Sequence, residues 1–583
     1  MRLVDSADGT RIAAYEEGNP DGPTVVLVHG WPDSHVMWDA TVPYLADDFR
    51  IIRYDNRGSR NSSVPKSVSS YTMAHYADDF AAVIDALAPG EKVHVLAHDW
   101  GSVGIWEYLS RAEAADRVAS FTSTSGPSAD HTRHFIMESL KRPYRPVRFA
   151  RGVSQFLRLT YQAGFSVPVI APLAVRATVP AIIPQMLKLH DDMSDNQIRH
   201  SESFATDAAN SLKVYPANYW RTLATGRRDH YVNVPVQVIV NTGDQFVRPH
   251  LYDETSEWVP RLWRRNIKSG HWSPMSHPQV LATAVRELAG HLAGGEPARA
   301  LRRAKVGGAR QYFSDTLVSV TGAGSGIGRA TALAFAREGA EVVISDVDEA
   351  ALKETATLLA DRGATAHPYV LDVADADAVS RFADQVCAEH GVPDVVINNA
   401  GIGHAGTFLD TPPEQWDRVL DVNFGGVVNG CRAFAGRLVE RGTGGHVVNV
   451  ASMAAYTPSQ AMNAYCTSKA AVYMFSDCLR AELDAAGIGL TTICPGVIDT
   501  NIVHTTRFDV PEDKAERVAG RRRQLERAFG ARHYSPDKVA KAVVAAVKKD
   551  KAVRPVTPEA YLAYGTSRLA PRLLRRAARS KLL

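Results

Sequence analysis

Short apolar runs alternate with helical patterns along the whole chain. In the first half these runs occupy residues 24–29, 51–55, 93–97 and 236–241. In the second half the same rhythm restarts, with runs at residues 317–321, 341–346, 394–398, 446–451 and 489–494. Runs in which nearly every position is apolar are typical of strands buried on both faces, as in a parallel sheet covered by helices. The pattern therefore predicts an α/β protein with two separate sheets.

The spacing of the runs also predicts domain boundaries. Residues 129–228 separate the third and fourth runs, and their helical periodicity indicates a helical cap inserted into the first α/β domain. Residues 294–308 are rich in glycine and arginine and have no strand pattern, which is typical of a linker. The alternative is a short basic helix on the surface of one domain. We predict a first domain at residues 1–293, a linker at 294–315 and a second domain at 316–583.

Composition narrows the class of protein and its compartment. The net charge of the 583 residues is only +3, and no basic patch interleaved with aromatic residues stands out, so we expect no nucleic-acid partner. The five cysteines form no C-x-x-C pair, which predicts reduced thiols in a cytoplasmic protein. We predict no metal site. The first residues lack the apolar region of a signal peptide, and no stretch reaches the ~18 continuous apolar residues of a spanning helix.

A sequence typical of a nucleophile elbow follows the run at residues 93–97. Residues 98–101 read H-D-W-G. A sharp strand-to-helix turn requires small neighbours, and Ala97 and Gly101 flank the nucleophile position. That position holds Asp99 where esterases and lipases have serine. An aspartate attacks sp³ carbon and forms an alkyl ester, so it is poorly suited to cleaving esters or amides.

Two further residues are expected to act with this aspartate. Asp244 follows the run at residues 236–241, and His271 follows later in the sequence S-G-H-W. Each residue alone has a structural interpretation: Asp99 as a helix N-cap, Asp244 as a turn residue and His271 as a surface histidine. The chain order nucleophile, acid, histidine is that of α/β hydrolases, and its occurrence in this context predicts a catalytic triad.

The first domain resembles epoxide hydrolases over its whole length. The resemblance rests on three motifs, H-G-W-P, H-D-W-G-S and G-H-W, at residues 29–32, 98–102 and 270–272. It implies an α/β-hydrolase fold in which Asp99 opens the epoxide. It also implies that His271 and Asp244 activate the water that splits the ester. We assign the two amides that stabilise the tetrahedral intermediate to Trp31 and Trp100.

The cap departs from the epoxide hydrolase pattern at one point. That family usually has two cap tyrosines that protonate the epoxide oxygen, the second in the sequence N-W-Y-R. Residues 218–221 read N-Y-W-R, so Trp220 stands where that tyrosine is expected. The candidates for the acid are therefore Tyr161 and Tyr219. A haloalkane dehalogenase needs no tyrosine acid and is one alternative, although such enzymes usually have asparagine at the position of Trp31. A non-catalytic ligand-binding domain is the other.

The second domain begins with a glycine-rich turn between a strand and a helical pattern. Residues 321–328 read T-G-A-G-S-G-I-G. Glycines permit a tight turn and let the backbone approach a pyrophosphate at the helix N-terminus. The next run ends at Asp346, whose carboxylate accepts hydrogen bonds from a ribose 2′-hydroxyl and repels a 2′-phosphate. Ser325 and Ser345 stand where NADP enzymes of this type tend to carry a basic residue, so we predict NAD in preference to NADP.

The remaining motifs of the second domain resemble the short-chain dehydrogenase family. They include N-N-A-G at residues 398–401 and Y-x-x-x-K at residues 465–469, with a serine thirteen residues before the tyrosine. The resemblance implies a Rossmann fold and assigns catalysis to Asn423, Ser452, Tyr465 and Lys469. It implies cofactor contacts at Gly322, Ser325, Gly326, Ile327, Gly328, Asp346, Asp372, Val373, Asn399, Ala400, Gly401, Tyr465, Lys469, Pro495, Gly496 and Thr500.

The tyrosine–lysine spacing has a chemical reason. Tyr465 and Lys469 lie at i and i+4, on one face of a helix. A lysine cation beside a phenol favours the phenolate, which is expected to lower the tyrosine pKa from ~10 toward neutrality. Tyr465 can then exchange a proton with a substrate hydroxyl as hydride moves to or from nicotinamide. Ser452 would hold the substrate oxygen, and Asn423 would order a water for the proton relay.

The chain ends in a basic, amphipathic segment at residues 568–581. Such a segment can lie on an anionic membrane surface; the alternative is a solvated or subunit-packing helix. The whole chain resembles fused epoxide hydrolase–dehydrogenase proteins, which implies a bifunctional enzyme. The apolar cap stretch at residues 167–186 favours a lipophilic, fatty-acid-like substrate. Short-chain dehydrogenases commonly associate, so we expect a homo-oligomer.

Overall fold

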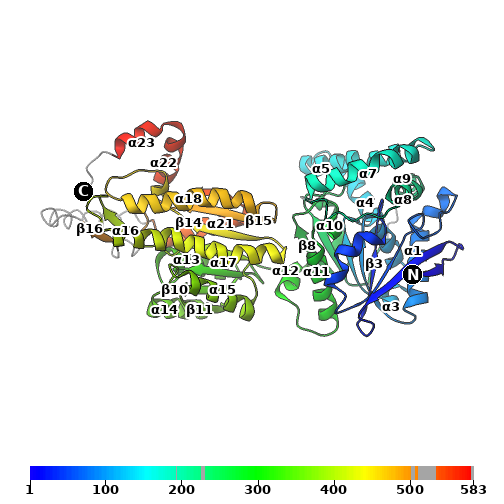
Figure 1. Cartoon of the computed structure of the whole chain (residues 1–583), viewed down its shortest axis with the longest axis horizontal. Helices are drawn as coiled ribbons and strands as arrows, with labels where there is room; N and C mark the ends of the chain where they lie inside the picture. The colour runs from blue at the N-terminus through cyan, green and yellow to red at the C-terminus, as the bar shows by residue number, and fades with distance from the viewer. Residues whose placement is uncertain (192, 225–229, 500–505, 510–533, 579–583) are drawn as a thin grey trace. The chain divides into compact units, whose positions relative to one another are not determined.

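Two compact units, Met1–Gly308 and Ala309–Leu583, make up the chain. The computed structural model describes residues 1–191, 193–224, 230–499, 506–509 and 534–578. Each unit is built around one large sheet (Figure 1). The prediction of two α/β sheets is therefore confirmed.

The first unit contains an eight-stranded sheet in the order β1-β2-β4-β3-β5-β6-β7-β8. Its strands are β1 (Arg2–Asp5), β2 (Arg11–Gly18), β3 (Thr24–Val28), β4 (Arg50–Tyr54), β5 (Val93–His98), β6 (Val118–Thr124), β7 (Val236–Asn241) and β8 (Leu262–Ile267). The first two strand pairs are antiparallel and the others are parallel. The helices outside the cap are α1 (Met73–Leu87), α2 (Asp99–Leu109), α3 (Ala114–Arg117), α10 (Ser273–Ser276), α11 (Pro278–Leu292) and α12 (Arg299–Ala304).

Both faces of this sheet are covered, which explains why its central strands are mostly apolar. Every residue of β3, β5 and β7 is buried. Val26 of β3 packs in a core cluster that contains residues of α1, whereas Val25 packs in another that contains residues of α11. Successive strand residues point to opposite faces, so both faces are buried, and polar residues such as His94 and Gln237 are accommodated through hydrogen bonds to Ser120 and the Ala284 carbonyl.

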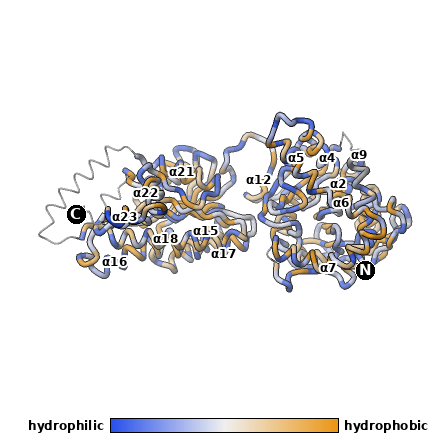
Figure 2. Tube along the Cα trace, turned by 90° about the horizontal axis from the view of Figure 1, so that it is seen from above, coloured by the Kyte–Doolittle hydropathy of each residue, from blue (hydrophilic) through white to orange (hydrophobic). Residues whose placement is uncertain are grey.

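The cap lies between β6 and β7 and is entirely helical in its described part. Its helices are α4 (Ala129–Leu140), α5 (Pro146–Leu159), α6 (Tyr161–Phe165), α7 (Ile170–His190), α8 (Phe204–Ser211) and α9 (Val214–Ala224). By length and composition α7 could cross a membrane, with a mean hydropathy of 1.4 over 18 residues (Figure 2). Arg176 interrupts its apolar run. One face of α7, which includes Val175 and Val179, is buried in the core cluster that contains α11.

The segment after α11 differs from the predicted linker. Residues 299–304 form helix α12, and Leu301 and Ala304 on it are buried against Trp263 and Leu288. These two apolar residues give the otherwise basic helix a face that packs on the first unit. The arrangement corresponds to the alternative interpretation of a short basic helix on a domain surface.

The second unit contains a seven-stranded parallel sheet in the order β11-β10-β9-β12-β14-β15-β17. Its strands are β9 (Leu317–Thr321), β10 (Glu341–Asp346), β11 (Ala366–Val370), β12 (Val395–Asn398), β14 (Gly445–Val450), β15 (Ile488–Cys494) and β17 (Val553–Pro555); β13 (His404–Gly406) and β16 (Arg507–Asp509) form a separate pair. Its described helices include α13 (Gly326–Arg337), α14 (Glu349–Ala360), α15 (Ala376–His390), α16 (Pro413–Leu420), α17 (Gly426–Arg441), α18 (Asn463–Leu483), α21 (Pro536–Lys548), α22 (Pro558–Leu569) and α23 (Pro571–Ala577).

The strand order reverses at β9, because β10 lies on one side of it and β12 on the other. In open α/β sheets ligands bind at the carboxyl ends of the strands beside such a reversal. The glycine-rich turn follows β9 directly. The topology therefore places the predicted cofactor turn where a parallel sheet can bind a ligand.

Candidate active sites

Asp99 lies at a strained turn between β5 and α2. Its φ is +48°, which residues other than glycine rarely adopt. Two glycines make room for the turn: a Cβ at Gly101 would collide with the carbonyl oxygen of His29, and a Cβ at Gly126 would collide with that of Asp99. The small residues around the turn are therefore required by the close approach of three backbone segments.

The structure brings the three predicted triad residues together. His271 Nδ1 lies 2.9 Å from Asp244 Oδ2, and His271 Nε2 lies 3.7 Å from Asp99 Oδ1. The backbone N–H groups of Phe246 and Val247 donate to Asp244 Oδ1, at 2.8 and 2.9 Å. Asp244 is thus fixed, and it orients the histidine ring toward Asp99.

Both predicted oxyanion donors face the nucleophile. The backbone N–H of Trp31 donates to Asp99 Oδ2 at 3.0 Å, and the backbone N–H of Trp100 also hydrogen-bonds to this carboxylate. A Cβ at Gly30 would lie 2.5 Å from the Asp99 Cβ, which explains the glycine in the H-G-W-P loop. When Asp99 becomes an ester, the same two amides can stabilise charge on its carbonyl oxygen.

Burial raises the pKa of the nucleophile, and neighbouring charges raise that of the base. Burial raises the pKa of Asp99 to about 6, against the opposing effects of His271 and the two tryptophan amides. Burial also lowers the pKa of His271, but the charges of Asp244, Asp99 and Asp191 outweigh that effect and raise it to about 9. Asp99 is therefore ionised at neutral pH, with a cationic imidazole beside it.

Aromatic rings from the cap surround this carboxylate. The Tyr215 ring lies 5.4 Å from the Trp100 ring and 5.9 Å from the Tyr161 ring. The Tyr161 ring in turn lies 5.5 Å from that of Phe246, next to the catalytic histidine. Burial raises the pKa of each of the two tyrosines, and the charge of Asp99 adds to both shifts. Two protonated phenols therefore lie near the nucleophile.

One of these tyrosines differs from the sequence-based assignment. Tyr161 is the predicted residue, but the ring contacts beside Trp100 are made by Tyr215 and not by Tyr219. Tyr219 lies one turn further along α9 and is half-buried. The prediction used the position of the arginine in N-Y-W-R. In the structure, the direction of α9 instead places Tyr215, four residues before Tyr219, near the nucleophile. A search of this segment for tyrosines one helical turn from Tyr219 would have found Tyr215.

Asp191, at the end of cap helix α7, holds the loop that carries His271. Its Oδ1 accepts hydrogen bonds from the backbone N–H of Gly270 at 2.8 Å and from the Ser269 hydroxyl at 3.0 Å. A Cβ at Gly270 would collide with the Asp191 carboxylate, so glycine is required there. Sequence patterns gave no indication of this cap–core contact.

A cavity of about 1640 Å³ opens at the strand reversal of the second unit. Nearly all predicted cofactor contacts line it, namely Gly322, Ser325, Gly326, Ile327, Asp346, Asp372, Val373, Asn399, Ala400, Gly401, Tyr465, Lys469, Pro495 and Gly496. Gly328 lies behind the turn, where a Cβ would collide with the carbonyl oxygen of Gly322. Thr500 lies outside the described residues.

The glycine turn and Asp346 fit a dinucleotide. Gly322 and Gly326 have φ of +65° and +53°, and a Cβ on Gly322 would approach the Ala400 Cα to 2.8 Å. Asp346 ends β10, and its Oδ2 accepts a hydrogen bond from the Gly324 N–H at 2.8 Å. The carboxylate is thus held at the cavity wall beside the turn, where a ribose would lie if the pyrophosphate bound at the start of α13.

The four predicted dehydrogenase residues lie together at this cavity. Ser452 and Tyr465 both line it, and a hydrogen bond from Ser452 lowers the tyrosine pKa. Lys469 Nζ lies 5.9 Å from the centre of the Tyr465 ring and donates to the carbonyl oxygen of Val450 at 3.1 Å. Asn423 lies behind them in a short π-helix, Asp421–Gly425, a distortion common at functional sites.

The expected lowering of the Tyr465 pKa is wrong. Burial raises the pKa of Tyr465 above its ordinary value, and the hydrogen bond from Ser452 compensates only in part. Burial also lowers the pKa of Lys469 to about 8. Desolvation is the largest cause of both shifts. Lys469 Nζ lies 5.9 Å from the ring centre and donates to the Val450 carbonyl.

Sequence reasoning missed the contribution of the C-terminal segment to this cavity. Leu574, Ala577 and Ala578 line it, together with apolar residues such as Met462 and Phe508. Leu574 and Ala577 belong to α23, part of the segment interpreted as a membrane-facing or packing helix. The small and apolar residues between the arginines of this segment were the feature of the sequence that could have indicated this contribution.

Comparison with known proteins agrees with this division into two sites. Models of the alpha/beta hydrolase fold and of the short chain dehydrogenase match residues 23–278 and 316–510. A protein of Mycobacterium tuberculosis, probable oxidoreductase EphD, is 66% identical over 585 residues, covering 100% of this chain and 99% of its own length. The 1-deoxy-11-beta-hydroxypentalenate dehydrogenase of Streptomyces exfoliatus is 42% identical over 186 residues, which are 32% of this chain and 68% of its own.

Among solved structures, a short chain dehydrogenase/reductase from Burkholderia phymatum in complex with NAD is 29% identical. It covers 46% of this chain and 97% of its own, with a TM-score of 0.42. The chain unites a hydrolase-fold domain and a nicotinamide-dependent short-chain oxidoreductase domain in one polypeptide. It belongs to the family of fused proteins represented by EphD.

Proposed function

We propose that the chain is a bifunctional enzyme acting on lipophilic substrates. The first unit hydrolyses an epoxide to a vicinal diol, and the second unit uses NAD to interconvert a secondary alcohol and a ketone. The observation that carries the first assignment is the pair of buried phenols, Tyr161 and Tyr215, beside Asp99 and Trp100.

The first step is attack by Asp99 on an epoxide carbon. A carboxylate oxygen forms a bond to carbon as the carbon–oxygen bond of the ring breaks, and the electron pair goes to the epoxide oxygen. Tyr161 or Tyr215 donates a proton to that oxygen, so a hydroxyl is released in place of an alkoxide. The product is an alkyl ester of Asp99.

The second step is hydrolysis of this ester. His271, oriented by Asp244 at 2.9 Å, takes a proton from water as the water oxygen attacks Cγ of Asp99. The amides of Trp31 and Trp100 stabilise the tetrahedral oxyanion. In the collapse the Cγ–O bond to the substrate breaks, His271 gives its proton to the departing alkoxide, and the diol leaves with one former carboxylate oxygen. The water oxygen remains in Asp99, whose carboxyl proton returns to the tyrosine.

The tyrosine pair and the triad also favour epoxide hydrolysis over the two alternatives. A departing halide needs no proton, so two phenols beside the nucleophile favour epoxide opening over dehalogenation. A domain that only bound ligand would need neither the Asp244–His271 pair nor the strained φ of +48° at Asp99. Strain of this kind is retained where the surrounding structure and the function require it.

For the second unit, the bound NAD would supply a hydride acceptor or donor. Tyr465 exchanges a proton with the substrate oxygen, Ser452 hydrogen-bonds to that oxygen, and Lys469 lies on the same helix face as the tyrosine. Asp346 supports NAD over NADP, because its carboxylate would repel a 2′-phosphate. Burial makes ionisation of Tyr465 costly, so a positive charge beside it on the nicotinamide would assist proton transfer.

The proposal of a lipophilic substrate rests on the cavity wall of the second unit. Met462, Phe508, Leu574 and Ala577 supply apolar surface to it. Apolar lining with a few polar groups is typical of sites for organic ligands. Substrate length can be tested with a series of alcohols of increasing alkyl chain, for which kcat/KM should rise with each added methylene.

Two variants separate the two activities. Asp99→Asn should abolish diol formation from a fatty-acid epoxide without NAD and leave NADH formation from a secondary alcohol intact. Tyr465→Phe should do the reverse. Release of halide from a bromoalkane with no diol from any epoxide would instead support dehalogenation. Unchanged activities in the Asp99→Asn variant would support a binding role for the first unit.

A further inference from the structure

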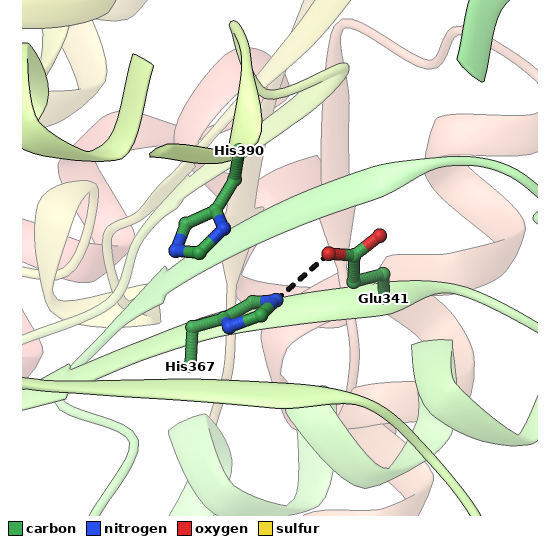
Figure 3. Close-up of side chains that lie close together, drawn as sticks. All are labelled: Glu341, His367 and His390. Atoms are coloured by element: carbon green, nitrogen blue, oxygen red, sulfur yellow. Dashed lines mark hydrogen bonds and ion pairs between the residues drawn. The ribbon is translucent and has the colours of Figure 1, made fainter. Parts of the chain in front are cut away.

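Three side chains that can ligate a metal meet at one edge of the second sheet, outside the lining of the cofactor cavity in that unit. Glu341 is the first residue of β10, His367 lies on the edge strand β11, and His390 is the last residue of α15. Each offers one ligand atom, and the three atoms lie within 4.8 Å of one another. Figure 3 shows the His390 ring lying over the His367 ring, with the Glu341 carboxylate beside them.

We propose that Glu341, His367 and His390 bind a divalent transition-metal ion of the zinc class. Two imidazole nitrogens and one carboxylate oxygen are ligands typical of Zn²⁺, whereas Mg²⁺ and Ca²⁺ prefer oxygen alone. Three protein ligands leave the fourth tetrahedral position to water. Their side chains are 25%, 23% and 15% exposed, so an ion has access from solvent.

The distances require only side-chain movement. His367 Nε2 lies 2.7 Å from Glu341 Oε1, and a metal bound to both in tetrahedral geometry would separate them by about 3.3 Å. The two imidazole rings are stacked, with centres 3.7 Å apart and planes inclined by 23°, so one ring must rotate before both lone pairs point at one ion. The backbone segments are held by β-pairing and helix packing, so the ligands are gathered before an ion arrives.

A neighbouring hydrogen-bond relay orients His390 for this role. The Tyr369 hydroxyl donates to Glu389 Oε2 at 2.7 Å and lies 2.8 Å from His390 Nε2. Because the phenol proton goes to the carboxylate, the phenol oxygen accepts from the His390 Nε2–H. That tautomer leaves the lone pair on Nδ1, and Figure 3 shows one ring nitrogen directed to the side where Glu341 and His367 meet. Metal-ligating histidines are commonly oriented in this way by a second residue.

The position of the cluster indicates a structural role for the ion. Glu341 begins β10 and Asp346 ends it, so at ~3.3 Å per residue the cluster lies about 16 Å from the cofactor end of the strand. An ion there would join β10, β11 and the end of α15. Since it would bind the folded state only, it would stabilise the second unit in proportion to its concentration.

The test is metal binding to the full chain after chelator treatment. Equilibrium dialysis against zinc should retain one tight equivalent, and cobalt should give the visible absorption of a tetrahedral site. His367→Asn and Glu341→Gln should remove that equivalent, and Tyr369→Phe should weaken binding about 10- to 100-fold. His291→Asn, which changes a half-buried histidine of the first unit, should have no effect.

Stability gives a second, independent readout. Zinc at a hundredfold excess over its Kd should raise the Tm of the second unit by about 5 °C or more, and the His367→Asn variant should show no rise. Its NAD-dependent rate without zinc should equal that of the parent chain, which shows that the variant is folded. The proposal is wrong if zinc retention and Tm shift are the same in His367→Asn and the parent, or if no equivalent is retained.

Discussion

Replacing Tyr215 with phenylalanine tests the assignment of the acid that opens the epoxide. The change removes one hydroxyl and keeps the ring that packs 5.4 Å from Trp100. General acid catalysis contributes typically ~10²–10⁴-fold. Because Tyr161 lies 5.9 Å away, ring to ring, and can still donate, the loss should be about 10²-fold. That loss corresponds to about 2.7 kcal/mol of transition-state stabilisation.

The assay is the rate of ester formation on Asp99, followed by rapid quench and mass spectrometry. Tyr219→Phe is the matched control, because it removes the same hydroxyl one turn along α9 and should change the rate less than about twofold. The double variant Tyr161→Phe/Tyr215→Phe should lose on the order of 10³–10⁴-fold. The NAD-dependent rate of each variant reports folding. Equal losses for Tyr219→Phe and Tyr215→Phe, or no loss for Tyr215→Phe, would refute the reasoning.

Three other changes have defined outcomes. Asp346→Ala removes a charged hydrogen-bond acceptor and should lower kcat/KM for NAD about 10- to 100-fold. The relative use of NADP should rise. An unchanged ratio of NAD to NADP activity in steady-state assays would show that the carboxylate does not select the cofactor. Asp191→Asn keeps an acceptor for the Gly270 N–H but removes a charge that raises the pKa of His271. The pH profile of ester hydrolysis should therefore shift to lower pH, and an unmoved profile would exclude electrostatic coupling to the cap. In the parent chain, the rate of ester formation should rise with pH through about 6 as Asp99 ionises. The rate of ester hydrolysis should rise through a pKa below about 9 as His271 loses its proton. This pKa is below that of the free enzyme because esterification removes the Asp99 charge that helps to raise the pKa of His271. Rapid-quench measurement of both steps from pH 5 to 10 checks the signs, and a fall of either rate over these ranges would contradict them.

The fold could be predicted because both sheets are buried on two faces. A nearly continuous apolar run such as β3 is typical of a strand covered on both faces. β11 could not be predicted in this way, because its sequence, A-H-P-Y-V, lies at the sheet edge and alternates with polar and half-exposed positions. Helix α12 was also hidden, since only Leu301 and Ala304 among its basic residues pack against the first unit.

The sites were predictable where a motif is local in the sequence. Asp99 with its glycines and Tyr465 with Lys469 depend on short spacings that a turn or one helix face imposes. Tyr215 was missed because the direction of a cap helix, and not its sequence, decides which tyrosine faces the nucleophile. The raised pKa of Tyr465 reflects burial by the whole domain, which local spacing does not reveal.

The contacts made by distant segments were not predictable at all. Glu341, His367 and His390 are separated by 26 and 23 positions in the sequence, and only the packing of β10, β11 and α15 brings them together. Asp191 reaches the loop of His271 from a helix 79 positions earlier than Gly270. In both cases the chemistry arises from tertiary structure, so no spacing rule could have indicated it.

A single turnover in oxygen-18 water tests the central claim most directly. The purified chain, in excess over a fatty-acid epoxide and without NAD, is allowed to form diol once, and the product and the peptide containing Asp99 are examined by mass spectrometry. The ester mechanism predicts that the first diol carries oxygen from Asp99 and that the label enters the Asp99 carboxylate. Label in the diol and none in Asp99 would contradict the mechanism, and the absence of any diol would contradict the assignment of the first unit as an epoxide hydrolase.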